Sequence, residues 1–127
     1  MLLDLLSQYL QEVEGAIREL EGAYVENYEE EILASNRVNL RIRVLFQTGH
    51  LLELNEAAIV EAGHIMHLGY RYHFQDQENR LVFRYDNTPH FPDLKSFPHH
   101  KHLSDKVDAV EEPSILNVIE EARLLAQ

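Results

Sequence analysis

The chain has 127 residues, no cysteine and a net charge of −11, and 45% of its residues are hydrophobic. This length and apolar fraction are typical of one globular domain and exclude a disordered chain, and the absence of cysteine excludes a disulfide framework and a thiolate metal site. A charge of this sign repels polyanions, so a nucleic-acid surface is expected only where acidic residues are sparse.

Charged residues and histidines are unevenly distributed along the chain. Residues 1–34 hold nine acidic and one basic residue, and residues 108–127 hold five and one. Residues 35–107 hold eight acidic and nine basic residues and all eight histidines. No run is long and apolar enough to span a bilayer, and the N-terminus lacks the basic region of a signal peptide. We therefore expect a cytoplasmic protein without a membrane partner, with its chemistry in the near-neutral middle.

The first predicted element is an amphipathic helix. Apolar residues recur at steps of three and four from residue 2 to residue 24, and Gly22 is expected to end the helix. Residues 24–34 are rich in β-formers and predict a strand, with a helix continuing to about residue 33 as the alternative.

The middle of the chain alternates between apolar and polar residues, as half-buried strands do. The predicted strands are residues 37–47, 51–61, 64–75 and 80–86, joined by short turns. In the third of these, strict alternation puts His67, Arg71 and His73 on one face and Tyr70 and Tyr72 on the other.

Residues 87–112 are predicted to be a loop, and Pro113 near the start of an apolar-periodic segment predicts a C-terminal helix. Because short turns join neighbouring strands, the fold class is α+β in a single domain, residues 1–127. One antiparallel meander of four or five strands is expected, with the N- and C-terminal helices covering one face. Its exposed edge strands could pair with those of a second copy, so a homodimer is one alternative.

The segment "YDNTPHFPDLKSFPHHKHL", residues 85–103, holds four of the eight histidines. In an extended chain His100 and His102 share a side, and an H-x-H pair can chelate a transition metal. His90, Asp86 and Asp93 are near in sequence and could complete such a site, and His90, His100 and His102 are the candidate metal ligands. A solvated or hydrogen-bonded loop is the alternative, and no cofactor is required by the sequence.

The same region offers acid–base chemistry, because an imidazole exchanges protons near neutral pH. Candidates for such proton transfer are His73, His90, His99, His100 and His102. Cations that could hold a phosphate are Arg71, Arg84 and Lys101. Tyr70 and Tyr72 could stack on unpaired bases, with a place in the core as the alternative.

The end of the last predicted strand carries two further candidates. Asp86 is a candidate to orient an imidazole or Arg84. Asn87 is predicted to form a turn through hydrogen bonds from its side chain to the backbone, and it is a candidate for substrate binding.

Residues 70–103 resemble the TumE family, which is found beside small antitoxin genes. The family pattern of Tyr-x-Tyr-His, Arg-Tyr-Asp-Asn-x-Pro-His and Phe-Pro-His-His-x-His is filled here by Tyr70, Tyr72, His73, Arg84, Tyr85, Asp86, Asn87, Pro89, His90, Phe97, Pro98, His99, His100 and His102. The position after His90, often a second histidine in the family, is Phe91. A looser similarity extends back through "LRIRVLFQTGHLLELNE".

This resemblance implies a toxin of a type II toxin–antitoxin pair that a cognate antitoxin protein neutralises. The resemblance implies a cellular role but no reaction, and the candidate residues leave three hypotheses open. The first is an enzyme that cleaves or modifies RNA at the histidine and arginine residues of 84–102. The second is a non-catalytic module that binds a partner protein, and the third is a metal-dependent hydrolase with histidine ligands.

Overall fold

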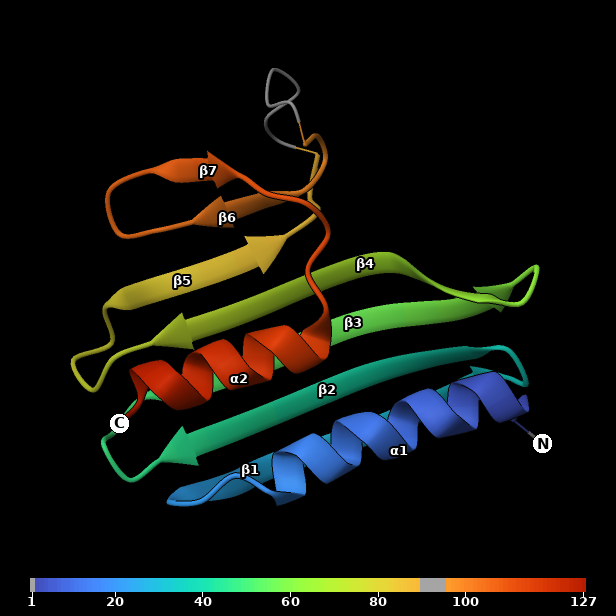
Figure 1. The fold of residues 1–127 in the computed structure, drawn as a ribbon, viewed down its shortest axis with the longest axis horizontal. Coiled ribbons are helices and arrows are strands. Elements are labelled where there is room, and N and C mark those ends of the chain that lie inside the picture. Colours follow the sequence, from blue (N-terminus) through green and yellow to red (C-terminus); the bar gives the residue numbers. More distant parts are fainter. Residues whose placement is uncertain (1, 90–95) are drawn as a thin grey trace.

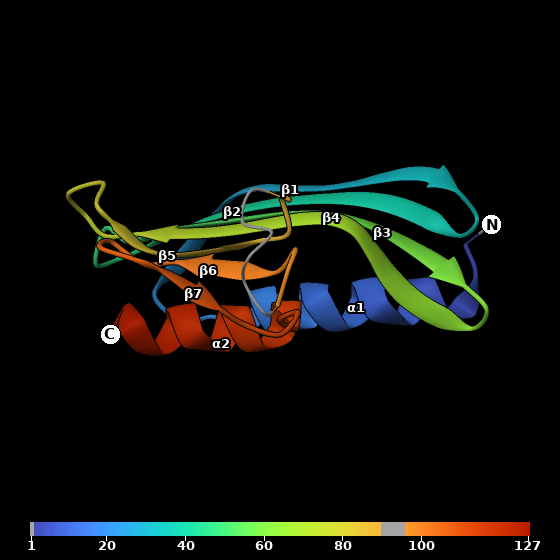
Figure 2. The same cartoon turned by 90° about the horizontal axis from the view of Figure 1, so that it is seen from above.

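The structure is a computed structural model that describes residues 2–89 and 96–127. In the described residues the elements are α1 (Asp4–Arg18), β1 (Ala23–Ala34), β2 (Arg37–Phe46), β3 (Leu51–Glu61), β4 (His64–Gln75), β5 (Leu81–Asp86), β6 (His100–His102), β7 (Val107–Ala109) and α2 (Ile115–Leu125). Each strand pairs antiparallel with the next, so the sheet order is β1 to β7. Both helices lie on the same face of this sheet (Figures 1 and 2). We call the other side the open face.

The predicted α+β class and the two covering helices are confirmed, but the predicted number of strands is wrong. Residues 87–112, predicted to be a loop, contain β6 and β7. Each of these strands has only three residues, too few to show a period in sequence. They form because β6 pairs with β5, and β7 then pairs with β6.

The core lies between the helices and the sheet. In β2 and β3 every second side chain points toward the helices, as the alternation predicted. The buried apolar residues include Leu6, Leu10, Val13 and Ile17 of α1, Val38, Leu40, Ile42 and Val44 of β2, Leu52 and Leu54 of β3, and Ile115, Val118 and Ile119 of α2. Neither helix is both long and apolar enough to cross a membrane.

The segment after the first helix is a strand, so the preferred prediction for residues 24–34 is confirmed. The helix itself ends at Arg18, earlier than the predicted stop at Gly22. Gly22 has a φ of 64°, a left-handed conformation that favours glycine, and its carbonyl accepts a hydrogen bond from the backbone N–H of Gln47. The glycine therefore turns the chain into β1 after the helix has ended.

A β-bulge in β4 overturns the predicted faces of that strand. The register with β3 shifts between Ala57, which pairs with Gly69, and Ala58, which pairs with His67. The extra residue reverses the alternation, so His67 points toward the helices, on the same side as Tyr70. His67 is thus on the opposite face from Arg71, contrary to the prediction of strict alternation.

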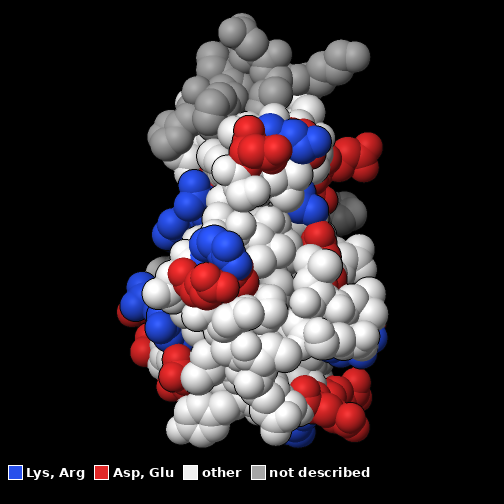
Figure 3. All heavy atoms as spheres, turned by 90° about the vertical axis from the view of Figure 1, so that its left-hand side faces the viewer, with Lys and Arg blue, Asp and Glu red and all other residues white. Residues whose placement is uncertain are grey.

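Charged side chains of both signs are interspersed on the molecular surface. Figure 3 shows the end of the molecule near the C-terminus, where Lys and Arg lie beside Asp and Glu in the described part of the face. Ion pairs on the surface include those of Arg80 with Asp76 and Glu78 in the turn before β5. Such exposed pairs contribute little to stability.

Candidate functional site

Adjacent strands bring the candidate residues together on the open face. Across the sheet, Arg84 of β5 lies opposite His73 of β4 on one side and His102 of β6 on the other. In the next row, Asp86 lies opposite His100. Residues two positions apart in a strand share a face, so all five side chains belong to the open face.

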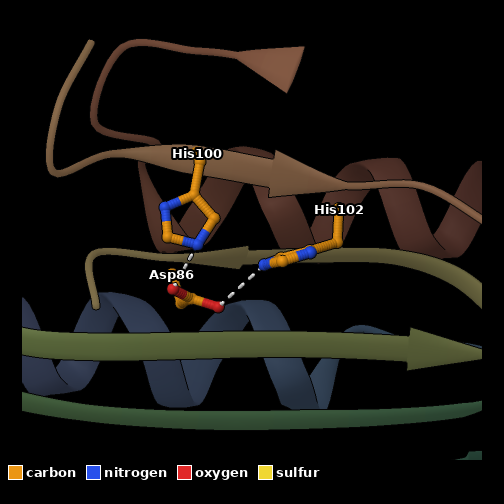
Figure 4. A group of neighbouring side chains, drawn as sticks. All are labelled: Asp86, His100 and His102. Atoms are coloured by element: carbon orange, nitrogen blue, oxygen red, sulfur yellow. Dashed lines mark ion pairs between the residues drawn. The ribbon is translucent and has the colours of Figure 1, made fainter. Parts of the chain in front are cut away.

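Asp86 is at the centre of this cluster (Figure 4). One carboxylate oxygen, Oδ1, is 2.7 Å from His100 Nε2 and accepts a hydrogen bond from the backbone N–H of Thr88. The other, Oδ2, is 3.5 Å from Arg84 Nε and 3.6 Å from His102 Nε2. A single carboxylate therefore positions two imidazoles and a guanidinium.

The contacts of His100 constrain its protons. Its Nδ1 is 3.0 Å from the carbonyl oxygen of Pro98, which can only accept, so Nδ1 carries a hydrogen. Its Nε2 lies 2.7 Å from Oδ1 of the Asp86 carboxylate, so the two groups form an ion pair when the imidazole carries its second proton. With a side chain only 1% exposed, His100 is suited to hold Asp86 in place rather than to reach a ligand.

His102 and His73 are more accessible than His100. The side chain of His102 is 17% exposed, and its ring lies edge-on to that of His100 with centroids 4.7 Å apart. The Nε2 atom of His73 is 2.9 Å from Gln75 Oε1. Its Nδ1 atom is buried and has no hydrogen-bond partner among the described residues. These two imidazoles flank the Arg84 guanidinium.

Other predicted site residues lie elsewhere. Tyr70 and Tyr72 are in the core under the helices, as the alternative interpretation had it. His99 stacks on Tyr70 and is 2.7 Å from its hydroxyl, away from His100. Lys101 donates a hydrogen bond to Glu121 and so ties β6 to α2 on the helix-covered face.

The remaining two predicted residues are Asn87 and His90. Asn87 forms a side-chain-to-backbone hydrogen bond, accepting from the N–H of Tyr70 at 3.0 Å, and thereby fixes the loop against the bulge in β4. His90 lies outside the described residues, so the predicted metal ligand set of His90, His100 and His102 is not brought together by any described contact.

Asp86, which was predicted as a residue that could complete a site on the H-x-H pair, does lie beside His100 and His102. One ligand atom each from Asp86, His100 and His102 lie within 4.8 Å of one another. Two imidazoles and a carboxylate suit zinc and other divalent transition metals. The Pro98 carbonyl that accepts from His100 Nδ1 would serve as the outer partner that orients a ligating imidazole.

A comparison with protein families now bears on this cluster. The family model described as "Toxin TumE" matches residues 10–124, which is most of the chain. The chain belongs to the TumE toxin family. Searches against curated proteins and against solved structures return no match for it.

A second polar cluster of this TumE-family protein lies on the helix-covered face, and sequence reasoning missed it. Glu56 of β3 is 1% exposed in its side chain and accepts a hydrogen bond at 2.6 Å from the hydroxyl of Tyr72. It also accepts one from Tyr9 of α1 and is 3.3 Å from His67 Nε2. The sequence did contain a sign of this cluster: in "LLELNEAAIVE", Glu56 occupies a position whose neighbours on the same face of the strand, Leu54 and Ala58, are apolar.

The protonation states in this second cluster follow from its surroundings. Burial, and then the charge of Glu56, raise the pKa of both Tyr9 and Tyr72, so both hydroxyls remain donors. Burial lowers the pKa of His67, but the hydrogen bond to Glu56 and the charges of Glu56 and Glu112 more than offset this, and the pKa ends above its ordinary value of 6.5. His67 thereby links Glu56 to the segment that precedes α2.

The raised pKa of His67 predicts how stability depends on pH in this TumE-family protein. The pKa of His67 is higher in the folded than in the unfolded state. Its contribution to the free energy of unfolding should therefore be fully present below about pH 6.5 and lost as the pH rises through the pKa of the folded state. Urea unfolding should therefore show a larger destabilisation by His67→Gln at pH 5.5 than at pH 8.5. His64→Gln, at an exposed position of β4, controls for loss of an imidazole; an equal effect of His67→Gln at both pH values would contradict the assignment.

Proposed function

We propose that this toxin acts on RNA at the open-face cluster of His73, Arg84, Asp86, His100 and His102. The observation that carries the proposal is the row of His73, Arg84 and His102 on three neighbouring strands, because it sets a cation between two imidazoles. Transfer at a phosphodiester without a metal needs these three groups: a base, an acid and a cation for the charge that develops on the phosphoryl oxygens.

The reaction that fits is transesterification within the RNA strand. His102 takes the proton of a 2′-hydroxyl, whose oxygen attacks the adjacent phosphorus. The bond from phosphorus to the 5′-oxygen breaks, and that oxygen takes a proton from His73. The guanidinium of Arg84 binds the phosphoryl oxygens, and Asp86 with His100 holds Arg84 and His102 in place. The products are a 2′,3′-cyclic phosphate and a 5′-hydroxyl.

A metal-dependent hydrolase is the second candidate, because the ligand atoms of Asp86, His100 and His102 are close enough to bind one ion after small movements. A bound divalent ion would polarise a phosphoryl oxygen or activate a water. In either case the family implies a cognate antitoxin as partner, and an RNA target would place the protein in the cytoplasm.

The test is growth arrest on induced expression in a bacterial host, followed by analysis of RNA ends. Arg84→Ala and His102→Ala should each reduce RNA cleavage by at least about 100-fold, the usual effect of losing one charge-stabilising donor or one acid–base group, and relieve the arrest. Arg80→Ala is the matched control, since this arginine lies in the turn before β5 and pairs with Asp76 and Glu78.

Three outcomes separate the candidates. If Arg84→Ala and His102→Ala both arrest growth as strongly as the wild type, the cluster is not the toxic site. Arrest with intact RNA would favour a toxin that only binds its target. Metal bound to untagged protein, with cleavage abolished by chelator, would select the metal-dependent reaction over the acid–base one.

A further inference from the structure

Three arginines on the open face form no ion pair with a carboxylate of the described residues. Five of the eight arginines form ion pairs with carboxylates: Arg18, Arg43, Arg80, Arg84 and Arg123. Arg37, Arg41 and Arg71 are exposed and have no carboxylate within 4.0 Å among residues 2–89 and 96–127. In a chain with a net charge of −11, cations left unpaired on one face are available for an anionic ligand.

Two of these arginines are in register with the candidate site. Arg41 of β2 pairs with Asn55 of β3, which pairs with Arg71 of β4. Arg71 then pairs with Asp86, and Asp86 with His100. The row crosses five strands at right angles to their direction, so Arg41 and Arg71 lie two strand spacings apart, about 10 Å.

A groove runs along this row. It has a volume of about 470 Å³, and its lining includes Asn39, Arg41, Asn55, Arg71 and Thr88. It is hollow because Ala57 and Gly69, which face each other across β3 and β4, have almost no side chain to fill the space.

The far rim of the groove is acidic. Glu29 and Glu31 of β1 form this rim, and they would keep an anion on the side nearer Asp86 and Arg84. The charge across the groove therefore changes from negative at β1 to positive toward the cluster.

We infer that this groove binds the sugar–phosphate backbone of a single-stranded RNA and leads it to the His102 and Arg84 end of the cluster. The inference rests on the proposed function, and it assigns the surface that holds the RNA substrate. Guanidinium groups match phosphate oxygens with paired hydrogen bonds, and the amide of Asn55 can bond to 2′-hydroxyls or base edges, whereas the amide of Asn39 donates to Glu31. The arginine and asparagine side chains that line the groove suit such a strand.

The test is the salt dependence of binding to a 12-nucleotide 2′-O-methyl oligouridylate labelled with fluorescein, which transesterification cannot cleave. Fluorescence anisotropy between 50 and 200 mM NaCl would compare the wild-type chain with the double variant Arg41→Gln, Arg71→Gln. We expect affinity at least about tenfold weaker, the effect of losing one or more charge-assisted hydrogen bonds. The slope of log Kd against log[NaCl] should fall by about 1.4, or 0.7 for each phosphate contact on a single strand.

The double variant Arg18→Gln, Arg123→Gln is the control, because it removes the same charge from the two helices, on the face away from the groove. It should leave the slope at the wild-type value. An unchanged slope in the groove variant, or an equal fall in the control, would overturn the inference.

The two proposals can fail separately. If the wild-type chain binds no oligonucleotide at 50 mM NaCl while His102→Ala still relieves growth arrest, the groove assignment fails and the catalytic site stands. If the groove arginines control binding while His102→Ala arrests growth as the wild type does, the catalytic proposal fails and the binding surface stands.

Discussion

Replacing Asp86 by asparagine should abolish growth arrest and lower the free energy of unfolding by about 3 kcal/mol, the range measured when one partner of a buried ion pair is removed. The Asp86 side chain is 6% exposed, and three groups that carry or can carry positive charge surround it. Asparagine keeps the shape but not the charge, and its amide nitrogen would face a donor. His100, which is 1% exposed, would be left as a buried group without its counter-charge.

The measurement is urea unfolding of purified Asp86→Asn beside the growth assay. Asp108→Asn is the matched control, because its ion pair with Lys106 is exposed and should contribute less than about 1 kcal/mol. Since a destabilised variant could lose activity merely by unfolding, the assay is informative at a temperature where unfolding data show the variant folded. Full toxicity of folded Asp86→Asn would contradict its role in positioning Arg84 and His102.

Replacing Glu56 by alanine should destabilise the protein by about 3 kcal/mol, because two buried hydroxyl donors lose their acceptor at about 1–3 kcal/mol each. Tyr72 is fully buried, and its hydroxyl donates to Glu56 Oε1 at 2.6 Å. Tyr9 donates to the other oxygen of the same carboxylate, so α1 would also lose its polar attachment to β3. The effect is expected on stability rather than on chemistry, since this cluster lies on the helix-covered face.

Glu53→Ala is the control for this substitution. Glu53 lies three residues before Glu56 on β3, on the open face, and its carboxylate pairs with the exposed Arg43 at 3.3 Å. Its loss should change the unfolding free energy by less than about 1 kcal/mol. Equal, small effects of the two substitutions in denaturant unfolding would show that the buried network contributes little.

Local patterns were sufficient to predict most of the fold. The alternation in β2 and β3 and the helical period of residues 4–18 identify these elements because the core lies on one side of each. The H-x-H pair was also a local signal: in an extended strand His100 and His102 must share a face, and both do point to Asp86. The α+β arrangement followed from short turns and two amphipathic helices.

Features that depend on pairing between strands could not be predicted in this way. The bulge between His67 and Gly69 reverses the faces of the residues before it in β4. His67 therefore contacts Glu56 and Tyr9 on the helix-covered face and does not lie on the open face. Lys101 was predicted beside the histidines, but its place in β6 turns it toward α2. The row from Arg41 through Asn55 to Arg71 joins three strands by register alone.

The sequence by itself determined the two helices, the main strands, the resemblance to TumE and the shared face of His100 and His102, because each depends on spacing within one segment. The tertiary structure alone decided that Asp86 is shared by His100, His102 and Arg84, and that an open groove continues from them. Both follow from the order and register of β2 to β6, which place residues tens of positions apart within a few ångströms of one another.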